Sequence, residues 1–115
     1  MTAIELDIEV EQGATFELAI GCLNTEDGQS FTPADLTGYT GTMQIRASQA
    51  ATAQLLATAT VTIDTASSVV TAIISDTLTA AMTWRSGVYD LKITNGTRSI
   101  RVARGKARFT LQVTS

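Results

Sequence analysis

Apolar and polar residues alternate along much of this chain with a period of two. The clearest case is the segment 4–11, where apolar Ile4, Leu6, Ile8 and Val10 alternate with acidic Glu5, Asp7, Glu9 and Glu11. This alternation predicts a half-buried first strand with a row of acids on its outer side. Similar patterns predict strands over 15–23, 39–48, 55–63, 69–74 and 107–113, separated by a loop at 24–37 and by shorter turns.

A hairpin is predicted across Asn95-Gly96, because these two residues best tolerate the positive φ angles of a two-residue turn. Such a turn also fixes the register of the two strands. It pairs Tyr89 with Val102 and Leu91 with Ile100 on the inner face, and Asp90 with Arg101 on the outer face. Gly105 is then expected to break the pattern, as a bulge or a corner, before Phe109, Leu111 and Val113 point inward.

Helical periodicity is limited to one short turn at 76–82, which Ser75 or Asp76 can cap and in which Leu78 and Met82 share a face. Seven or eight short strands with regular turn signals are typical of an all-β fold. We therefore predict an immunoglobulin-like antiparallel β-sandwich, with a small barrel as the alternative. The length of 115 residues fits a single domain over 1–115.

Composition excludes several kinds of catalysis. The chain has no histidine, so a Ser–His or Cys–His nucleophile is impossible. Cys22 is the only cysteine, and it shares strand parity with the inward Phe16, Leu18 and Ile20, so we expect a buried thiol. No phosphate-binding glycine loop is present. We predict a protein that is not an enzyme and needs no cofactor or metal.

Charge is distributed very unevenly. The first 45 residues contain eight acids and no base, whereas the remaining 70 contain all eight bases and three acids. Two uses of this asymmetry remain open. It can clamp the two ends of the chain together, or it can make the front of one copy attract the back of another.

The candidate contact residues are the acids of the first strand and the bases near the C-terminus: Glu5, Asp7, Glu9, Glu11, Arg98, Arg101, Arg104, Lys106 and Arg108. The acids are spaced about 6.5–7 Å apart along the strand, too far for one cation without further ligands. They form a partner-facing row, an internal clamp or, less favoured, a calcium site. Arg98 and Arg104 share the parity of inward Ile100 and Val102, which places them at strand ends. A chain with net charge −3 and few aromatic residues is not expected to bind nucleic acid.

Trp84 and Tyr39 are candidates for a glycan-binding platform. A lone tryptophan at the mouth of a strand more often seals the end of a core. The N-terminus lacks the features of a signal peptide, and no apolar run reaches the ~20 residues that span a membrane. We therefore expect synthesis and folding in a cytoplasm, no membrane partner and no small-molecule substrate.

Three stretches, taken in order, carry a family resemblance: 10–18 (VEQGATFEL), 35–46 with Asp35-Leu36-Thr37-Gly38-Tyr39-Thr40 and Met43-Gln44-Ile45-Arg46, and 84–91 ending Gly87-Val88-Tyr89-Asp90-Leu91. Over most of its length the chain resembles small β-sandwich structural domains of tailed bacteriophages and prophages, akin to the N-terminal domain of upper-baseplate proteins.

The resemblance implies a non-enzymatic virion structural or accessory protein of the tail, baseplate or capsid surface. It would be made in the bacterial cytoplasm, reside in the virion, and bind other virion proteins and copies of itself. Baseplate relatives carry a receptor-binding or trimerising region that this chain lacks, so the resemblance favours an adaptor, decoration or connector. The alternative function is a carbohydrate-binding module for host-surface glycans that uses Trp84 and Tyr39.

Overall fold

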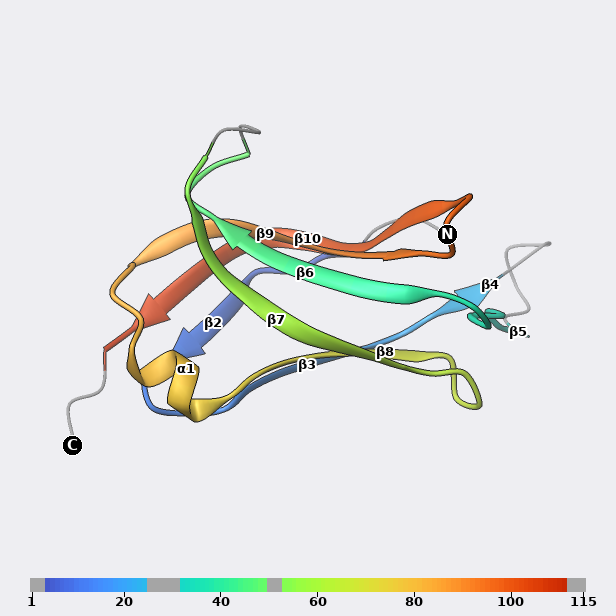
Figure 1. Cartoon of the computed structure of the whole chain (residues 1–115), viewed down its shortest axis with the longest axis horizontal. Helices are drawn as coiled ribbons and strands as arrows, with labels where there is room; N and C mark the ends of the chain where they lie inside the picture. The colour runs from blue at the N-terminus through green and yellow to red at the C-terminus, as the bar shows by residue number, and fades with distance from the viewer. Residues whose placement is uncertain (1–3, 25–31, 50–52, 112–115) are drawn as a thin grey trace.

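The computed structural model describes residues 4–24, 32–49 and 53–111, and these form ten strands and one short helix. The elements in chain order are β1 (Ile4–Glu5), β2 (Ile8–Glu11), β3 (Phe16–Gly21), β4 (Leu23–Asn24), β5 (Thr32–Pro33), β6 (Thr40–Arg46), β7 (Leu55–Asp64), β8 (Val69–Ile74), α1 (Asp76–Ala80), β9 (Ser86–Thr94) and β10 (Ser99–Thr110). The all-β prediction is confirmed (Figure 1).

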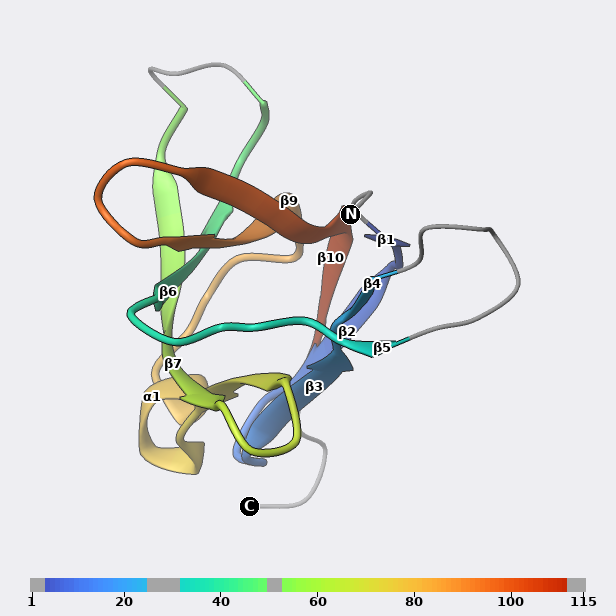
Figure 2. The ribbon, with the colours of Figure 1, turned by 90° about the vertical axis from the view of Figure 1, so that its right-hand side faces the viewer.

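Eight of the strands belong to one curled sheet in the order β1-β10-β9-β6-β7-β8-β3, with β2 also paired to β10. The long strand β7 carries the sheet around its bend, because Ala57 to Ala59 pair with β6 whereas Thr60 to Asp64 pair with β8. Viewed along the long axis, the strands surround a common interior (Figure 2). One continuous curled sheet does not establish the predicted sandwich of two packed sheets.

The sheet is mixed rather than purely antiparallel, because its first and last strands run in the same direction. Ile4 is in register with Ala103, and Ile8 is in register with Ala107. The first and last strands are therefore neighbours, as an internal clamp between the two ends of the chain requires. Parallel pairing is possible here because the whole sheet separates the two strands in sequence.

The core consists of inward-facing side chains from the strands and from the connection before β6. Its fully buried members include Val10, Cys22, Leu36, Met43, Ile45, Val70, Ile74, Leu91, Ile93 and Val102. The prediction of a buried Cys22 is therefore confirmed, and burial raises the pKa of its thiol. Ala57 and Ala59 are buried, and Val61 and Ile63 pack partly buried against the same core.

The predicted first strand is broken, and its N-terminal half does not reach the core. Ile8 and Val10 are buried as expected, but Ile4 and Leu6 are 46% and 40% exposed. The prediction that all four point into the core was wrong for these two. β1 has only β10 as a neighbour and lies at the margin of the sheet, where no second layer covers its apolar side chains.

The hairpin forms at the predicted place but with a different turn. Pairing begins at Thr94 and Ser99, and the loop is closed by a hydrogen bond from Asn95 N to Arg98 O of 3.1 Å. The Asn95 Oδ1 accepts hydrogen bonds from the backbone nitrogens of Thr97 and Arg98 at 3.1 and 2.8 Å. Only Gly96 in this loop has a positive φ, of 96°. The two-residue turn was therefore wrong, because the Asn95 side chain stabilises a longer loop.

The register of the hairpin differs accordingly. Tyr89 lies opposite Gly105, Leu91 opposite Ala103 and Asp90 opposite Arg104, and a bulge occurs between Arg101 and Ala103. Gly105 lies inside β10 and does not end it, so the predicted break was also wrong. Beyond β10, Leu111 is 50% exposed and does not point inward, and Val113 lies outside the described residues.

The single predicted helical turn is confirmed as α1. Ser75 is its N-cap, and the Ser75 hydroxyl accepts a hydrogen bond from Leu78 N at 3.3 Å. Thr79 is buried, and its hydroxyl contacts the carbonyl of Ala14 at 2.8 Å. The helix thereby ties the turn between β2 and β3 to the connection between β8 and β9.

Candidate functional site

The outward surface of β6, β9, β10 and the β1–β2 segment carries six of the eight bases of the chain. We call it the charged face; its charged members are Glu5, Asp7, Glu9, Arg46, Asp90, Lys92, Arg101, Arg104, Lys106 and Arg108. The bulge in β10 determines which bases belong to it. Because Val102 and Ala103 are both buried, Arg104 and the alternate residues after it point outward. The expectation that Arg104 sits at a strand end was wrong.

The parallel register places the acid row directly beside the basic strand. Glu5 is in register with Arg104, and Glu9 is in register with Arg108. A guanidinium nitrogen of Arg104 lies 2.9 Å from Glu5 Oε1, in a pair with both side chains largely exposed. The internal clamp, one of the arrangements considered for the acid row, is therefore present at this pair. An exposed pair of this kind contributes only about 0.2–1 kcal/mol.

Asp7 stabilises the strand junction in another way, at the point where β1 ends and β2 begins. In a regular parallel ladder, Leu6 O would accept a hydrogen bond from Lys106 N. Here Lys106 N donates instead to Asp7 Oδ1 at 3.0 Å, and Leu6 O accepts a hydrogen bond from the Tyr89 hydroxyl. Leu6 N still donates to Arg104 O at 2.9 Å. Two side chains thus replace one ladder bond.

Gly105 makes this junction possible. It lies opposite Tyr89, and a Cβ atom at this position would overlap the Leu6 carbonyl group. Without a side chain at 105, the Tyr89 ring can cross β10 and reach the strand beyond it. Tyr89 is 4% exposed, and burial, followed by the nearby Asp7 carboxylate, raises the pKa of Tyr89 to about 12. The hydroxyl therefore remains a donor at neutral pH.

The predicted contact between Asp90 and Arg101 exists, but across a diagonal. Arg101 Nε lies 3.7 Å from Asp90 Oδ2, whereas the residue opposite Asp90 is Arg104. Both side chains are about half exposed. Asp90 therefore lies next to two bases of β10, Arg101 and Arg104. Because the ion pair is exposed, Asp90 contributes little to stability, and its main effect is to place a negative charge among the bases of the charged face.

A shallow groove of about 730 Å³ crosses the charged face. Its lining includes Arg46 and Lys92, which the sequence patterns did not single out, together with Lys106. The Arg46 guanidinium is held in place by hydrogen bonds to Ala53 O and Gln44 Oε1, each 3.0 Å long. Within the described part of the chain, no carboxylate lies within ion-pair distance of Arg46, Lys92 or Lys106.

Two predicted contact residues lie outside this arrangement. Arg98 is exposed in the hairpin loop, and its backbone nitrogen, rather than its guanidinium, is bonded. Glu11 is exposed on β2 and is in register with Thr110, so no base lies beside it on β10. The structure therefore brings together Glu5, Asp7 and Glu9 with the bases of β10, but not Glu11 or Arg98.

Trp84 and Tyr39 do not form one platform. Trp84 precedes β9, and Tyr39 precedes β6, whose first residue pairs with the last residue of β9. The two rings therefore lie at opposite ends of β9, roughly 30 Å apart at about 3.4 Å per residue. Both are half-buried against the core, and the Trp84 ring packs on Phe109 with centroids 5.1 Å apart. This geometry matches a tryptophan that seals the core.

Neither a metal-binding cluster nor a membrane-spanning helix occurs among the described residues. No three cysteine or acidic side chains among residues 4–24, 32–49 and 53–111 are grouped closely enough to hold a metal ion. None of the helices in the same ranges is long and apolar enough to cross a membrane. The charged face is thus the main concentration of functional groups that the structure describes.

Comparison with known proteins adds no family to this picture. No protein-family model matches the chain, and no curated protein sequence matches it significantly.

Proposed function

We propose that this protein is a non-enzymatic structural or accessory component of a tailed-bacteriophage particle, acting as an adaptor or decoration at the tail, baseplate or capsid surface. The observation that carries the proposal is the charged face, a registered array of opposite charges with a shallow groove and unpaired cations. The resemblance of the sequence to phage structural domains supplies the biological setting.

The charged face is better suited to protein contacts than to chemistry. Its carboxylates are exposed or bonded to neighbouring bases and backbone, and the chain contains no histidine to act as a base. Arrays of alternating charge give specificity and a fixed register to protein interfaces, while adding modest affinity. These are the requirements of a component that must find one orientation among many copies in a particle.

Incorporation into particles tests this proposal. The epitope-tagged protein, produced during induction of a phage that encodes it, is expected to co-sediment with particles in a density gradient. Immunogold labelling should then place it at the tail, baseplate or head. Recovery of the tagged protein only in the soluble fraction, with intact particles lacking it, would contradict the proposal.

A charge-reversed variant adds a test of the face itself. Glu5→Lys with Glu9→Lys places like charges beside Arg104 and Arg108, so it should loosen the β1–β2 segment and reduce incorporation. The matched control is Glu11→Lys with Asp35→Lys, which changes the net charge equally on exposed residues that no base pairs with in the described structure. Equal incorporation of both variants and the wild type would show that the charged face is not the docking surface.

A further inference from the structure

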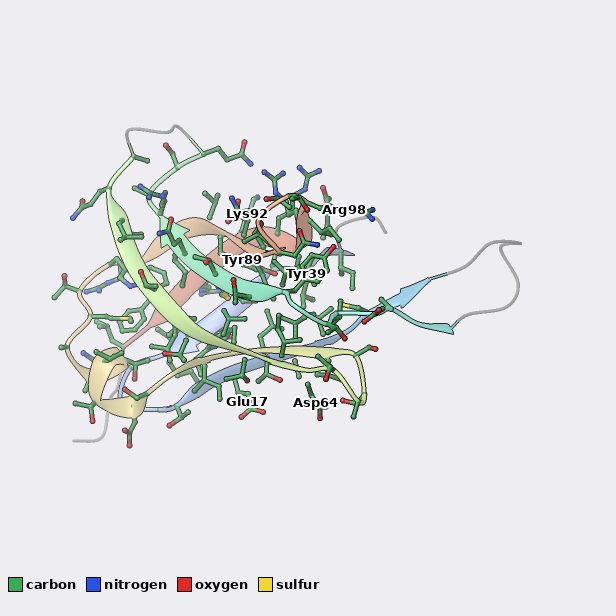
Figure 3. All side chains as sticks on the ribbon, turned by 45° about the vertical axis from the view of Figure 1, so that its right-hand side comes forward. Glu17, Tyr39, Asp64, Tyr89, Lys92 and Arg98 are labelled. Carbon is green, nitrogen blue, oxygen red and sulfur yellow. The ribbon has the colours of Figure 1, made fainter. Side chains whose placement is uncertain are left out.

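On the side of the molecule away from the charged face, the described strands and helix carry acids but no base. No lysine or arginine occurs between Arg46 and Arg85 or anywhere before Arg46, so β3, β7, β8 and α1 carry no base. The acids on these elements are Glu17, Asp64 and Asp76. Figure 3 shows Glu17 and Asp64 on the side of the ribbon away from Lys92 and Arg98. We call Glu17, Asp64, Asp76 and the strands between them the acidic face.

Apart from these three acids, the acidic face carries no charged residue on β3, β7, β8 and α1. Glu17 is exposed on β3, which pairs with β8 in a regular antiparallel ladder, and it lies opposite the uncharged Ile73. Asp64 ends β7, and its Oδ1 accepts hydrogen bonds from Ala66 N and Ser67 N at 3.0 and 3.3 Å. The Ser67 and Ala66 hydrogen bonds lower the pKa of Asp64, so the carboxylate stays charged under mildly acidic conditions.

The charged face, in contrast, retains positive charge after its internal pairs are formed. Glu5 and Asp90 pair with Arg104 and Arg101, and among the described residues no carboxylate forms an ion pair with the groove cations Arg46, Lys92 and Lys106. Arg46 and Lys106 flank Val88, one on each side, because both are in register with it. The backbone positions of Arg46 and Lys106 are therefore two strand spacings apart, roughly 10 Å.

We propose that the groove of one copy receives the acidic face of a second copy, so that the protein associates head to tail. This inference deepens the proposed function, on which it rests, by naming the partner of the charged face as the chain itself. A head-to-tail contact joins two different surfaces, so each bound copy leaves a free groove and a free acidic face. Such contacts propagate into rings or filaments.

A second copy fits the groove better than a polyanion does. The groove also contains the carboxylates of Glu5, Asp7 and Asp90 between its cations. A continuous phosphate backbone would pass over these carboxylates and be repelled. The acidic face instead carries separate carboxylates on a neutral surface, which can be placed over the unpaired cations.

Charge exchange between two variants tests this arrangement. Variant one is Lys92→Glu with Lys106→Glu, which reverses the groove. Variant two is Glu17→Lys with Asp64→Lys, which reverses the acidic face. Sedimentation velocity and light scattering are measured at about 10 mM and about 1 M salt, where the Debye length is about 30 Å and 3 Å. The matched control is Arg85→Glu with Arg98→Glu, which makes the same change of charge at exposed residues outside the charged face and its groove.

The wild type is expected to associate at low salt and to dissociate at high salt. Each reversed variant alone should associate at least about tenfold more weakly, and the control should keep most of its association. An equimolar mixture of the two variants should regain association, because each reversed surface again meets an opposite charge. Recovery on mixing also shows that both variants are folded. The neutral pair Lys92→Gln with Lys106→Gln should give an intermediate result.

Three results would overturn the inference: a wild type that is monomeric at low salt, a reversed variant that associates as the wild type does, or a mixture that stays monomeric. Particle incorporation separates this failure from failure of the proposed function. A monomeric wild type that still enters particles would mean that the charged face docks on another virion protein. A wild type that associates but never enters particles would leave self-association standing without the phage role.

Discussion

Replacing Tyr89 with phenylalanine tests the junction that joins the N-terminal segment to the sheet. The change removes one oxygen atom and keeps the ring, so the packing of the core is preserved. It leaves the Leu6 carbonyl without the hydroxyl that bonds it, while Asp7 still accepts from Lys106 N. Loss of one intramolecular hydrogen bond costs about 0.5–1.5 kcal/mol, and more where the group left behind is shielded from water. We therefore expect the free energy of unfolding at pH 7 to fall by about 1–2 kcal/mol.

The same substitution changes how stability depends on pH. The folded pKa of Tyr89 is about 12, whereas an unfolded tyrosine titrates near pH 10. Below pH 10 both states are protonated, and the folded state keeps its full advantage. Between about pH 10 and 12 the unfolded state loses its proton first, so the wild type loses roughly 2 kcal/mol of stability. The phenylalanine variant has no such loss, and the two stabilities should converge as the pH rises.

Urea unfolding, followed by circular dichroism, measures both effects at pH 7, 9 and 11. Other titrating groups, including Cys22, are common to both proteins and cancel in the difference. Tyr39→Phe is the matched control, because no described residue hydrogen-bonds the Tyr39 hydroxyl, and it should change stability by less than about 0.5 kcal/mol. Equal stability of wild type and Tyr89→Phe at pH 7, with parallel decline above pH 9, would refute the buried hydrogen bond.

Three further substitutions have expected outcomes in the same unfolding assay. Gly105→Ala should lower the free energy of unfolding by about 1–3 kcal/mol, because its Cβ would overlap the Leu6 carbonyl. Gly21→Ala is the control and should be nearly neutral, because the space around Gly21 is open. Equal effects of the two substitutions would contradict the close approach of Leu6 to Gly105. Trp84→Ala should lower the free energy of unfolding by about 2–3 kcal/mol, because the ring packs on Phe109. The carbohydrate-binding alternative would be favoured if the wild type bound a glycan on an array and Trp84→Ala abolished that binding without loss of stability. Ser75→Ala should cost about 0.5–2 kcal/mol through loss of the helix cap, and an unchanged midpoint would argue against it.

Local patterns predicted the elements that local physics determines. The run Val69–Ile74 forms β8 with the predicted bounds, and Ser75 caps α1 as its side chain and position suggested. Alternation also identified Ile8 and Val10 as core residues. It failed for Ile4 and Leu6 because alternation shows which residues share a face, not whether another layer covers that face.

The hairpin register shows where local rules compete. Asn-Gly favours a two-residue turn, but the Asn95 side chain can also bond the backbone two and three residues ahead. The longer loop is the one that allows Tyr89 to lie opposite Gly105 and to reach Leu6. That advantage depends on a segment more than 80 residues away in sequence, so turn chemistry alone could not reveal it.

The charged face was predictable in part. Net charge along the chain indicated that the N-terminal acids and the C-terminal bases could meet, and their register confirms it for Glu5. The bulge at Val102 could not be read from the sequence, so the direction of Arg104 was wrong. Arg46 and Lys92 were missed because each is the single base on its strand. The usable signal was that both alternate with buried residues and therefore point outward.

The asymmetry of charge in the sequence therefore supports two arrangements that do not exclude each other. The acids before residue 10 are placed beside the bases of β10, where they act on stability through an internal pair and a strand junction. The acids of β3, β7 and α1 have no such neighbours, and neither do the cations of the groove. Substitutions in the first set should change the unfolding free energy at any protein concentration. Substitutions of Glu17, Lys92 and Lys106 should act mainly on association, whereas those of Asp64 and Arg46 should also change stability, because their side chains hydrogen-bond neighbouring segments.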